Sequence, residues 1–230
     1  LLLDWMAELV GYPQTALGNL ASGGSMATLI CIVTARETHA IKAKDFDKSV
    51  VYLTTLTHHC VRKGLHIAGM GECVLRYVPV DEGFRMDPKA LAECIEKDKH
   101  DGLKPWLVVA SAGTTDLGNV DDFNAIADVA VEQKLWFHID GAYGGFFILS
   151  ELVKEKFKGV ERSDSTVMNP HKPLHTPFGL GAALIKNGEL LYKAHHYTAS
   201  YLQDNNLEQD EVSPSDLGPE LTRHFRALRL

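Results

Sequence analysis

A lysine and an aspartate each follow a short apolar run, and both side chains suit chemistry on a small molecule. Lys172 comes after the run STVMN, within the sequence NPHK. A lysine amine forms a Schiff base with a carbonyl compound when burial or cationic neighbours lower its pKa. Asp140 ends the run LWFHID and precedes GAYGG, so its carboxylate could face a cationic nitrogen. Taken singly, each has an ordinary alternative: a solvated surface lysine, and an acid that caps a helix or closes a turn.

A segment of small residues near the start of the chain suits a phosphate group. Gly23, Gly24 and Ser25 directly precede a helical pattern. Small residues let the backbone approach a ligand closely, and the first turn of a helix presents free N–H groups. The alternative is a plain glycine-rich turn in which Ser25 is the N-cap of the helix.

Two further segments follow apolar runs and could contact a flat ligand ring. His58 and His59 come after VVYLT, and one of them could stack on such a ring. The local sequence barely separates the two, although His59 better fits a surface position at the start of a helix. Thr114 and Thr115, in SAGTTDLG, could supply hydroxyl groups, with turn capping as the alternative.

Strand-like runs alternate with helical patterns, which is typical of an α/β domain with a mostly parallel sheet. Asp87 and Pro88 are expected at the N-cap and first position of one helix. Ligands of open α/β sheets bind at the carboxyl ends of the strands, where all the segments above lie. The expected strands are 50–54, 73–80, 106–113, 135–140, 165–169 and 181–186, and the expected helices include 1–13, 25–37, 58–69, 87–97, 121–134 and 220–230.

These segments together carry more information than any one of them. In chain order they offer a phosphate cradle, a ring stacker, hydroxyl donors, a buried acid and a lysine. Pyridoxal phosphate needs these parts: an anchor for its phosphate, contacts to its ring and ring oxygen, a partner for its pyridine nitrogen and a Schiff-base lysine. The conjunction therefore predicts pyridoxal 5'-phosphate as the cofactor.

The same segments resemble a known family. The blocks SGGSMAT, THH, ASAGTTDLGNVDDF, WFHIDGAYGG and SDSTVMNPHK resemble the group II pyridoxal-phosphate-dependent amino-acid decarboxylases, of the aromatic-L-amino-acid decarboxylase type. The resemblance covers essentially the whole chain. It implies the large domain of fold type I (aspartate-aminotransferase-like), with a mostly parallel central sheet flanked by helices. On this basis, residues 1–230 are expected to be part of a large cofactor-binding domain, without the family's N-terminal segment and C-terminal small domain.

The resemblance also implies roles for individual residues. Lys172 would form the Schiff base, Asp140 would pair with the pyridine nitrogen, and His58 rather than His59 would stack on the ring. Tyr201 would be the tyrosine associated with decarboxylation, in a mobile catalytic loop at 197–220. The other cofactor contacts that the resemblance implies are Gly24, Ser25, Thr115, Ala142, Asn169 and His171.

The implied reaction is decarboxylation of an L-amino acid to the corresponding amine and CO₂, a carboxy-lyase activity of amino-acid metabolism. The tyrosine favours this outcome, because relatives that make aldehydes replace it. Alternatives are another fold-type I enzyme (an aldehyde synthase, an aminotransferase or a different lyase) and a non-catalytic homologue that binds the cofactor. The sequence departs from the family pattern at Met26, often glutamate, and at Pro173, often tryptophan.

The composition of the chain argues against some classes of binding partner. Twenty-three Lys and Arg against 30 Asp and Glu give a net charge of −7, which argues against nucleic acid and anionic membrane surfaces. No apolar stretch is long enough to span a membrane. The four cysteines show neither a CxxC pair nor metal-ligand spacing, so we expect reduced thiols in a cytoplasmic protein without a metal. The resemblance adds a homodimer with an amino-acid substrate, and the predicted helices at both ends favour a piece of a longer chain.

Overall fold

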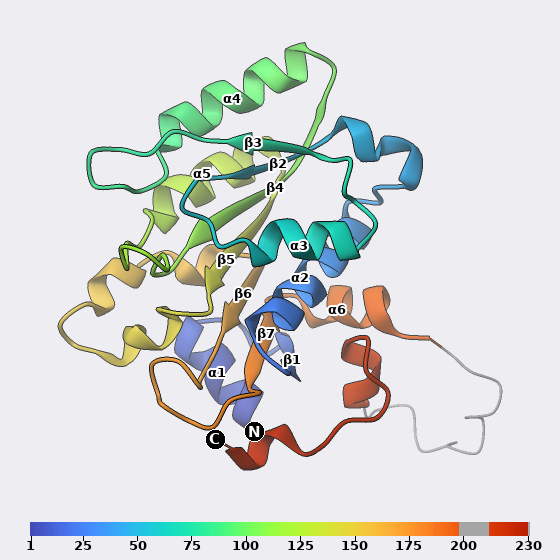
Figure 1. Ribbon diagram of the computed structural model, residues 1–230, viewed down its shortest axis with the longest axis vertical. Coiled ribbons are helices and arrows are strands. Elements are labelled where there is room, and N and C mark those ends of the chain that lie inside the picture. The colour runs from blue at the N-terminus through green and yellow to red at the C-terminus, as the bar shows by residue number, and fades with distance from the viewer. Residues whose placement is uncertain (198–211, 230) are drawn as a thin grey trace.

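A single sheet of seven strands forms the centre of the computed structural model, which describes residues 1–197 and 212–229 (Figure 1). The strand order is β1-β7-β6-β5-β4-β2-β3. The strands are β1 (Leu17–Ala21), β2 (Ser49–Leu53), β3 (Val74–Tyr77), β4 (Lys104–Ser111), β5 (Trp136–Gly141), β6 (Ser165–Met168) and β7 (Gly181–Ile185).

The sheet is mostly parallel, as predicted. Strands β3, β2, β4, β5 and β6 run in the same direction. Strand β7 is antiparallel to β6, and β1 is antiparallel to β7, so β1 again runs with the parallel set. The carboxyl ends of six strands therefore meet at one edge of the sheet.

Helices cover both faces of the sheet (Figure 1). One face packs against α2 (Gly24–Thr38), α3 (Cys60–Ile67) and α6 (Gly188–His195). The other packs against α1 (Leu2–Val10), α4 (Pro88–His100) and α5 (Phe123–Gln133). This three-layer arrangement confirms the predicted α/β fold class. Short 3₁₀ helices lie in the connections: η1 (Ala43–Lys48), η2 (Gly145–Leu149), η3 (Lys154–Phe157), η4 (Val160–Arg162), η6 (Pro214–Leu217) and η7 (Arg226–Arg229).

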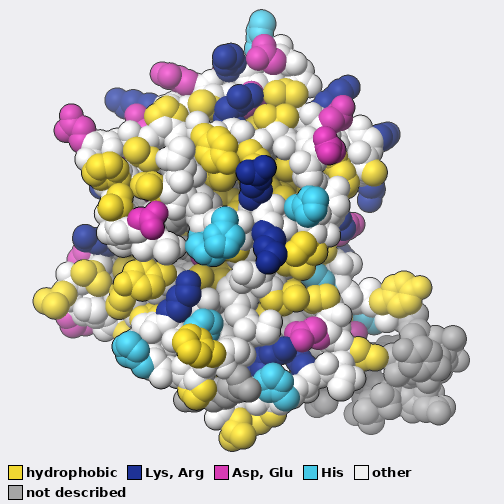
Figure 2. Space-filling model, in the orientation of Figure 1, with side chains coloured by type: hydrophobic (Ala, Val, Ile, Leu, Met, Phe, Trp, Pro, Cys, Tyr) yellow, Lys and Arg dark blue, Asp and Glu magenta, His cyan; other side chains and the backbone are white. Residues whose placement is uncertain are grey.

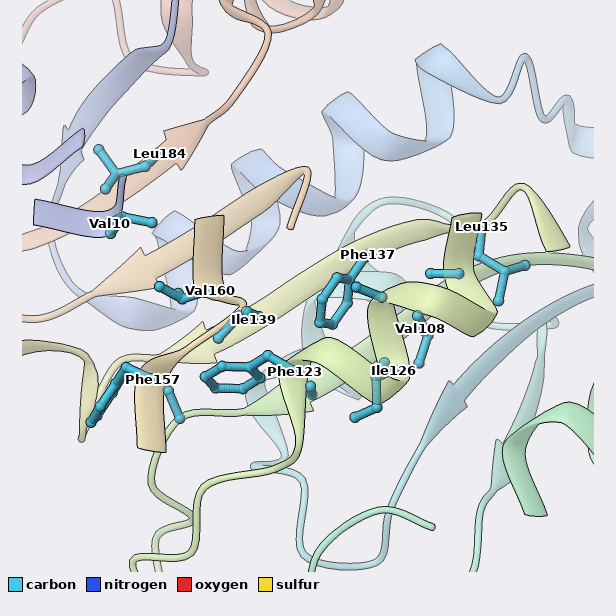
Figure 3. Close-up of a cluster of buried hydrophobic side chains, with 14 of the residues drawn as sticks. Val10, Val108, Phe123, Ile126, Leu135, Phe137, Ile139, Phe157, Val160 and Leu184 are labelled. Atoms are coloured by element: carbon cyan, nitrogen blue, oxygen red, sulfur yellow. The ribbon is translucent and has the colours of Figure 1, made fainter. Parts of the chain in front are cut away.

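Strand β5 shows how the two faces differ. All six of its residues are buried. Phe137 and Ile139 point toward α5, where they pack near Phe123 and Ile126 (Figure 3). The alternate residues point toward the α2 and α3 face, because successive side chains of a strand lie on opposite faces.

Local sequence explains several helix boundaries. The side chain of Asp87 accepts hydrogen bonds from the N–H groups of Lys89 and Ala90, and Pro88 occupies the first helical position. This confirms the predicted start of α4. The side chain of Asp122 caps α5 in the same way, and α1 ends at Gly11, which has a left-handed φ of 79°.

Three elements differ from expectation. Strand β1 was not predicted, because Gly18 and Asn19 are poor strand formers. Helix α6 was also not predicted. The predicted helix at 220–230 is wrong: residues 220–225 have no helical structure, and only η7 follows. Tertiary contacts override its helical pattern, since Arg223 and Arg226 both donate hydrogen bonds to the carbonyl oxygen of Leu20.

Within 1–197 and 212–229, no helix combines the length and the apolar composition that crossing a membrane would require.

Candidate active site

The candidate site lies at the carboxyl edge of the sheet. Asp140 is the second-to-last residue of β5, and Thr115 follows β4. His58 follows β2, while Asn169 and Lys172 follow β6. Parallel neighbouring strands bring these segments together, so residues far apart in sequence share one edge.

Two adjoining cavities at this edge contain the predicted residues. His58, Ala142 and Lys172 line both cavities, so the two cavities are adjacent. The larger cavity has a volume of about 390 Å³, within the usual range for a small-molecule site. The larger cavity is also lined by Gly24, Ser25, Asn169 and His171, and the smaller one by Thr115 and Asp140. All predicted site residues among the described ones are thus brought together.

One end of the larger cavity is the N-terminus of α2. The helix begins at Gly24, its N-cap is Gly23 with a φ of 155°, and no side chain caps it. The alternative in which Ser25 is the N-cap is therefore wrong; Ser25 is the second residue of the helix. An uncapped helix N-terminus presents N–H donors and a positive dipole end to an anion.

Asn169 packs closely against this helix N-terminus. Its side chain is 2% exposed, and its Oδ1 has no hydrogen-bond partner among the described residues. A Cβ atom added to Gly24 would lie only 2.8 Å from Asn169 Nδ2 and 3.1 Å from the Cβ of Ala142. Only glycine fits there, because the side chains of Asn169 and Ala142 occupy the space that a Cβ atom would need.

The other end of the site holds the carboxylate of Asp140, which is 7% exposed. Its Oδ1 accepts a hydrogen bond from the N–H of Ala142 at 3.1 Å. Its Oδ2 accepts one from the thiol of Cys60 at 3.8 Å. Burial raises the pKa of that thiol to about 12, so Cys60 keeps its proton and acts as a donor.

His58 lies between the two ends. Its Nδ1 accepts a hydrogen bond from the N–H of Cys60 at 3.2 Å, so the neutral ring carries its proton on Nε2. Burial lowers the pKa of His58, and the charges of His59 and Lys172 lower it further, while Asp140 acts in the opposite direction. The ring is therefore a neutral donor at physiological pH. His59 is exposed and lines neither cavity, which separates the two histidines that the local sequence left open.

Lys172 sits in a turn after β6. Its backbone N–H donates to the carbonyl oxygen of Asn169 at 3.1 Å. Its amine is partly buried and forms no hydrogen bond or ion pair with any residue that the structure describes. The neighbouring His171 donates from Nδ1 to the carbonyl oxygen of Leu180 at 2.5 Å, which leaves Nε2 available as an acceptor in the neutral ring.

The two threonines after β4 have different surroundings. Thr114 is buried, and its hydroxyl accepts a hydrogen bond from the N–H of Asn119, so it stabilises the turn. Thr115 is exposed and lines the smaller cavity with Asp140 and Lys172. Thr114 also lines this cavity, but its hydroxyl already accepts the Asn119 bond, whereas no hydrogen bond to the Thr115 hydroxyl is present among the described residues.

Tyr201 lies outside the described residues. The later part of the expected loop at 197–220 is described from residue 212 onward. There, Ser213 caps η6 reciprocally with Asp216, and the carbonyl oxygen of Leu217 accepts a hydrogen bond from Asn19 at 2.7 Å.

A basic surface adjoins the site. Figure 2 shows lysine, arginine and histidine side chains gathered over α3, on a chain whose net charge is −7. A groove along this helix, which begins at Cys60, is lined by His59, Arg62, Lys63 and His66. Local positive charge of this kind raises the concentration of an anionic ligand near the site.

The residues present fit pyridoxal phosphate. The uncapped N-terminus of α2 and the close-packed Gly24 suit its phosphate group, and the buried carboxylate of Asp140 suits its pyridine nitrogen. The amine of Lys172 lines both cavities between them. Among residues 1–197 and 212–229, no cluster of three metal-ligating side chains is present.

Sequence reasoning missed two polar residues near Asp140. Cys60 contacts both Asp140 and His58, and no sequence signal distinguishes it from an ordinary buried cysteine. His138 lies two residues before Asp140 on the same face of β5 and is 1% exposed. The alternation of strand side chains could have identified it.

A mostly parallel sheet with these residues at its carboxyl edge defines a pyridoxal-phosphate protein of fold type I. The chain belongs to the family described as "Pyridoxal-dependent decarboxylase conserved domain", whose match covers residues 1–230.

Known relatives place the chain within this family. It is 36% identical to the aromatic-L-amino-acid decarboxylase of Bacillus atrophaeus over 229 residues, 99% of this chain and 47% of that protein. It is 32% identical to the L-2,4-diaminobutyrate decarboxylase of Acinetobacter baumannii over 249 residues, 100% of this chain and 48% of that protein. The crystal structure of Oryza sativa TDC with PLP and tryptamine matches with a TM-score of 0.90 at 28% identity, over 99% of this chain and 49% of that one. The chain thus spans about half the length of the curated relatives it matches.

Proposed function

We propose that the protein containing this chain decarboxylates an L-amino acid to its amine and CO₂, with pyridoxal phosphate bound to Lys172 as a Schiff base. The observation that supports this most is the adjacency of the two cavities. Lys172 and His58 line both of them, Asp140 lines the smaller one, and the anion cradle at the start of α2 lines the larger one. The residues 1–230 would form most of the large domain of a homodimeric, cytoplasmic enzyme.

When bound, pyridoxal phosphate supplies an electron sink for the electron pair left behind as CO₂ departs. The carboxylate of Asp140 would hold a proton on the pyridine nitrogen, because a nearby negative charge favours the protonated form. Burial at 7% exposure strengthens this interaction, since little water screens it. Asp140 is thus the residue that would keep the ring cationic.

His58 would stack on the ring and bind the substrate. Its Nδ1 is already occupied by the N–H of Cys60, so only Nε2–H is free to donate. A neutral donor at that position can orient a substrate carboxylate without a strong ion pair that would hold the departing group in place. His58 would therefore position the bond that breaks.

The remaining site residues would hold the cofactor. Gly24, Ser25, Asn169 and His171 surround the larger cavity and would bind the phosphate end. Ala142 would pack beneath the ring, and its N–H already fixes the Asp140 carboxylate. Thr115, which lines the smaller cavity, would contact the cofactor through its hydroxyl.

Tyr201 would deliver the proton to the substrate carbon after CO₂ leaves. The loop 197–220 that contains it would close over the site and exclude water. Tyr201→Phe removes the proton donor and keeps the ring. We expect amine formation to fall sharply while the cofactor stays bound, and unchanged amine formation would remove Tyr201 from the mechanism.

The direct test of the cofactor lysine uses the full-length protein. Lys172→Ala should abolish the visible absorption band of the Schiff base, because no amine remains to form it. Lys158→Ala, at an exposed lysine paired with Glu155, is the matched control and should keep the band. A full band in Lys172→Ala would overturn the assignment.

The reaction is tested by offering a panel of amino acids and analysing the products. The panel includes tyrosine, tryptophan, Dopa, glutamate and diaminobutyrate. Equal amounts of amine and CO₂ support the proposal. Aldehyde with ammonia would indicate an aldehyde synthase, a keto acid would indicate an aminotransferase, and a visible band without any turnover would indicate a non-catalytic homologue.

A further inference from the structure

A buried histidine lies directly behind the proposed pyridine partner. His138 occupies β5 two residues before Asp140, so both side chains point to the same face of the sheet. It is 1% exposed, on the face covered by α2 and α3. None of the roles described above uses it.

A chain of hydrogen bonds sets the orientation of this ring. The indole N–H of Trp136 donates to Ser165 Oγ at 2.8 Å, and the same oxygen lies 2.8 Å from His138 Nδ1. The Ser165 hydroxyl has one proton and two acceptor lone pairs, so after accepting from the indole it can still donate its proton to His138 Nδ1. When it does, the proton of the neutral imidazole lies on Nε2.

The Nε2–H group of His138 is then a buried donor without an acceptor among the described residues. A buried donor without an acceptor destabilises the folded state, so such groups are rare in native proteins. Burial lowers the pKa of His138 to about 4, and the charge of Asp140 opposes this shift. The ring therefore stays neutral at physiological pH and feels the negative charge of Asp140.

Asp140 has spare capacity as an acceptor. A carboxylate offers about four acceptor positions. Only two donors contact this one among the described residues: the N–H of Ala142 and the weakly donating thiol of Cys60. An unsatisfied donor and an undersupplied acceptor thus lie on one face of β5, two residues apart.

We propose that His138 carries its proton on Nε2 and is a positioning residue for Asp140: its Nε2–H donates to the Asp140 carboxylate through one water, and this keeps that carboxylate charged and aimed at the cofactor nitrogen. Ser165 and Trp136 hold the donor in place. This inference rests on the proposed function, because it assigns a partner to the residue that would hold the pyridine nitrogen.

The test uses the full-length protein and three readouts: the affinity for pyridoxal phosphate, the pH dependence of the visible absorption band, and the thermal unfolding of the apo-protein. His138→Phe removes the donor and keeps a ring of similar shape. His138→Gln places an amide N–H near the position of Nε2. Ser165→Ala removes the group that orients the imidazole and changes little volume. Phe137→Leu is the matched control, because Phe137 is the adjacent buried residue on the opposite face of β5.

We expect His138→Phe to weaken pyridoxal phosphate binding about tenfold and to shift the pH dependence of the band, since a hydrogen bond to a charged group is lost. His138→Gln should recover part of the affinity, and Ser165→Ala should show a smaller loss in the same direction. Phe137→Leu should lower the unfolding temperature and leave both cofactor readouts unchanged.

Wild-type affinity and an unchanged pH dependence in His138→Phe or Ser165→Ala would overturn the proposal and leave His138 as a core residue. Equal losses of affinity in Phe137→Leu and His138→Phe would overturn it too, because general destabilisation would then explain both. A wild-type protein that does not bind pyridoxal phosphate would instead overturn the proposed function itself.

Discussion

The two faces of strand β5 are equally buried and chemically opposite. Phe137 and Ile139 pack into the apolar layer beneath α5 (Figure 3). The alternate residues of the strand face α2 and α3 and carry polar groups: Trp136, His138 and Asp140. Strand geometry alone produces this division, because neighbouring side chains alternate between faces.

The two faces of this six-residue strand therefore have different roles: one contributes to stability and the other to the candidate site. The apolar face buries large side chains without polar atoms. Its contribution to the free energy of folding is proportional to the apolar area removed from water. The polar face buries a carboxylate and an imidazole, and each is costly to bury unless a partner is supplied. Cys60, Ala142 and Ser165 supply partners only in part, which leaves Asp140 and His138 with unused hydrogen-bonding capacity. We infer that the spare acceptor capacity of Asp140 serves a ligand and that the spare donor of His138 serves Asp140.

The largest expected effect comes from the apolar face. Phe137→Ala removes a fully buried ring and should lower the free energy of unfolding by about 3–5 kcal/mol. The loss is measured by urea unfolding of the apo-protein. Below its unfolding transition, the variant should still bind one pyridoxal phosphate per chain. Loss of cofactor binding in folded protein would contradict the separation of the two faces.

The next effect comes from the polar face. Asp140→Asn keeps the shape and removes the charge, so turnover should fall about a hundredfold or more. The free energy of unfolding should change by less than about 1 kcal/mol. Steady-state kinetics and urea unfolding measure the two quantities. Asp122→Asn is the control, because asparagine caps a helix as well as aspartate does and Asp122 lies at the start of α5.

Per pH unit, the smallest effect is a pH dependence of stability that only the polar face should show. Burial lowers the pKa of His138 from 6.5 to about 4, so between these values the unfolded chain binds a proton that the folded chain does not. Stability should therefore fall as the pH drops from 6.5 to 4. Relative to His138→Phe, the slope should be steeper by up to about 1.4 kcal/mol per pH unit. If the free energy of unfolding depends on pH in the same way in the wild type and in His138→Phe, then His138 has the same pKa in the folded and unfolded chains.

Sequence patterns predicted most of the fold because the parallel strands are short apolar runs bounded by turn signals. They missed β1, where Gly18 and Asn19 gain their strand geometry from pairing with β7. They wrongly extended a helix over 220–225, where Arg223 bonds to the backbone of β1 instead. In both cases contacts distant in sequence outweigh local preference.

The sequence was sufficient to predict which residues form the candidate site, but not the hydrogen bonds between them. Motif order at the strand ends was sufficient to select Lys172, Asp140 and His58, because the topology of a parallel sheet brings those ends together. Which histidine enters the cavity depends on where α3 begins, and the local sequence does not determine that. The contact of Cys60 with Asp140 arises only when α3 packs against β5, so no spacing rule reveals it.

The central claim is that Lys172 carries pyridoxal phosphate at the carboxyl edge of the sheet. The most direct measurement is borohydride reduction of the full-length protein with its cofactor, followed by proteolysis and mass spectrometry of the peptides. We expect a single peptide with the reduced cofactor attached to Lys172. The same adduct on another lysine, or none in a protein that shows the visible band, would contradict it.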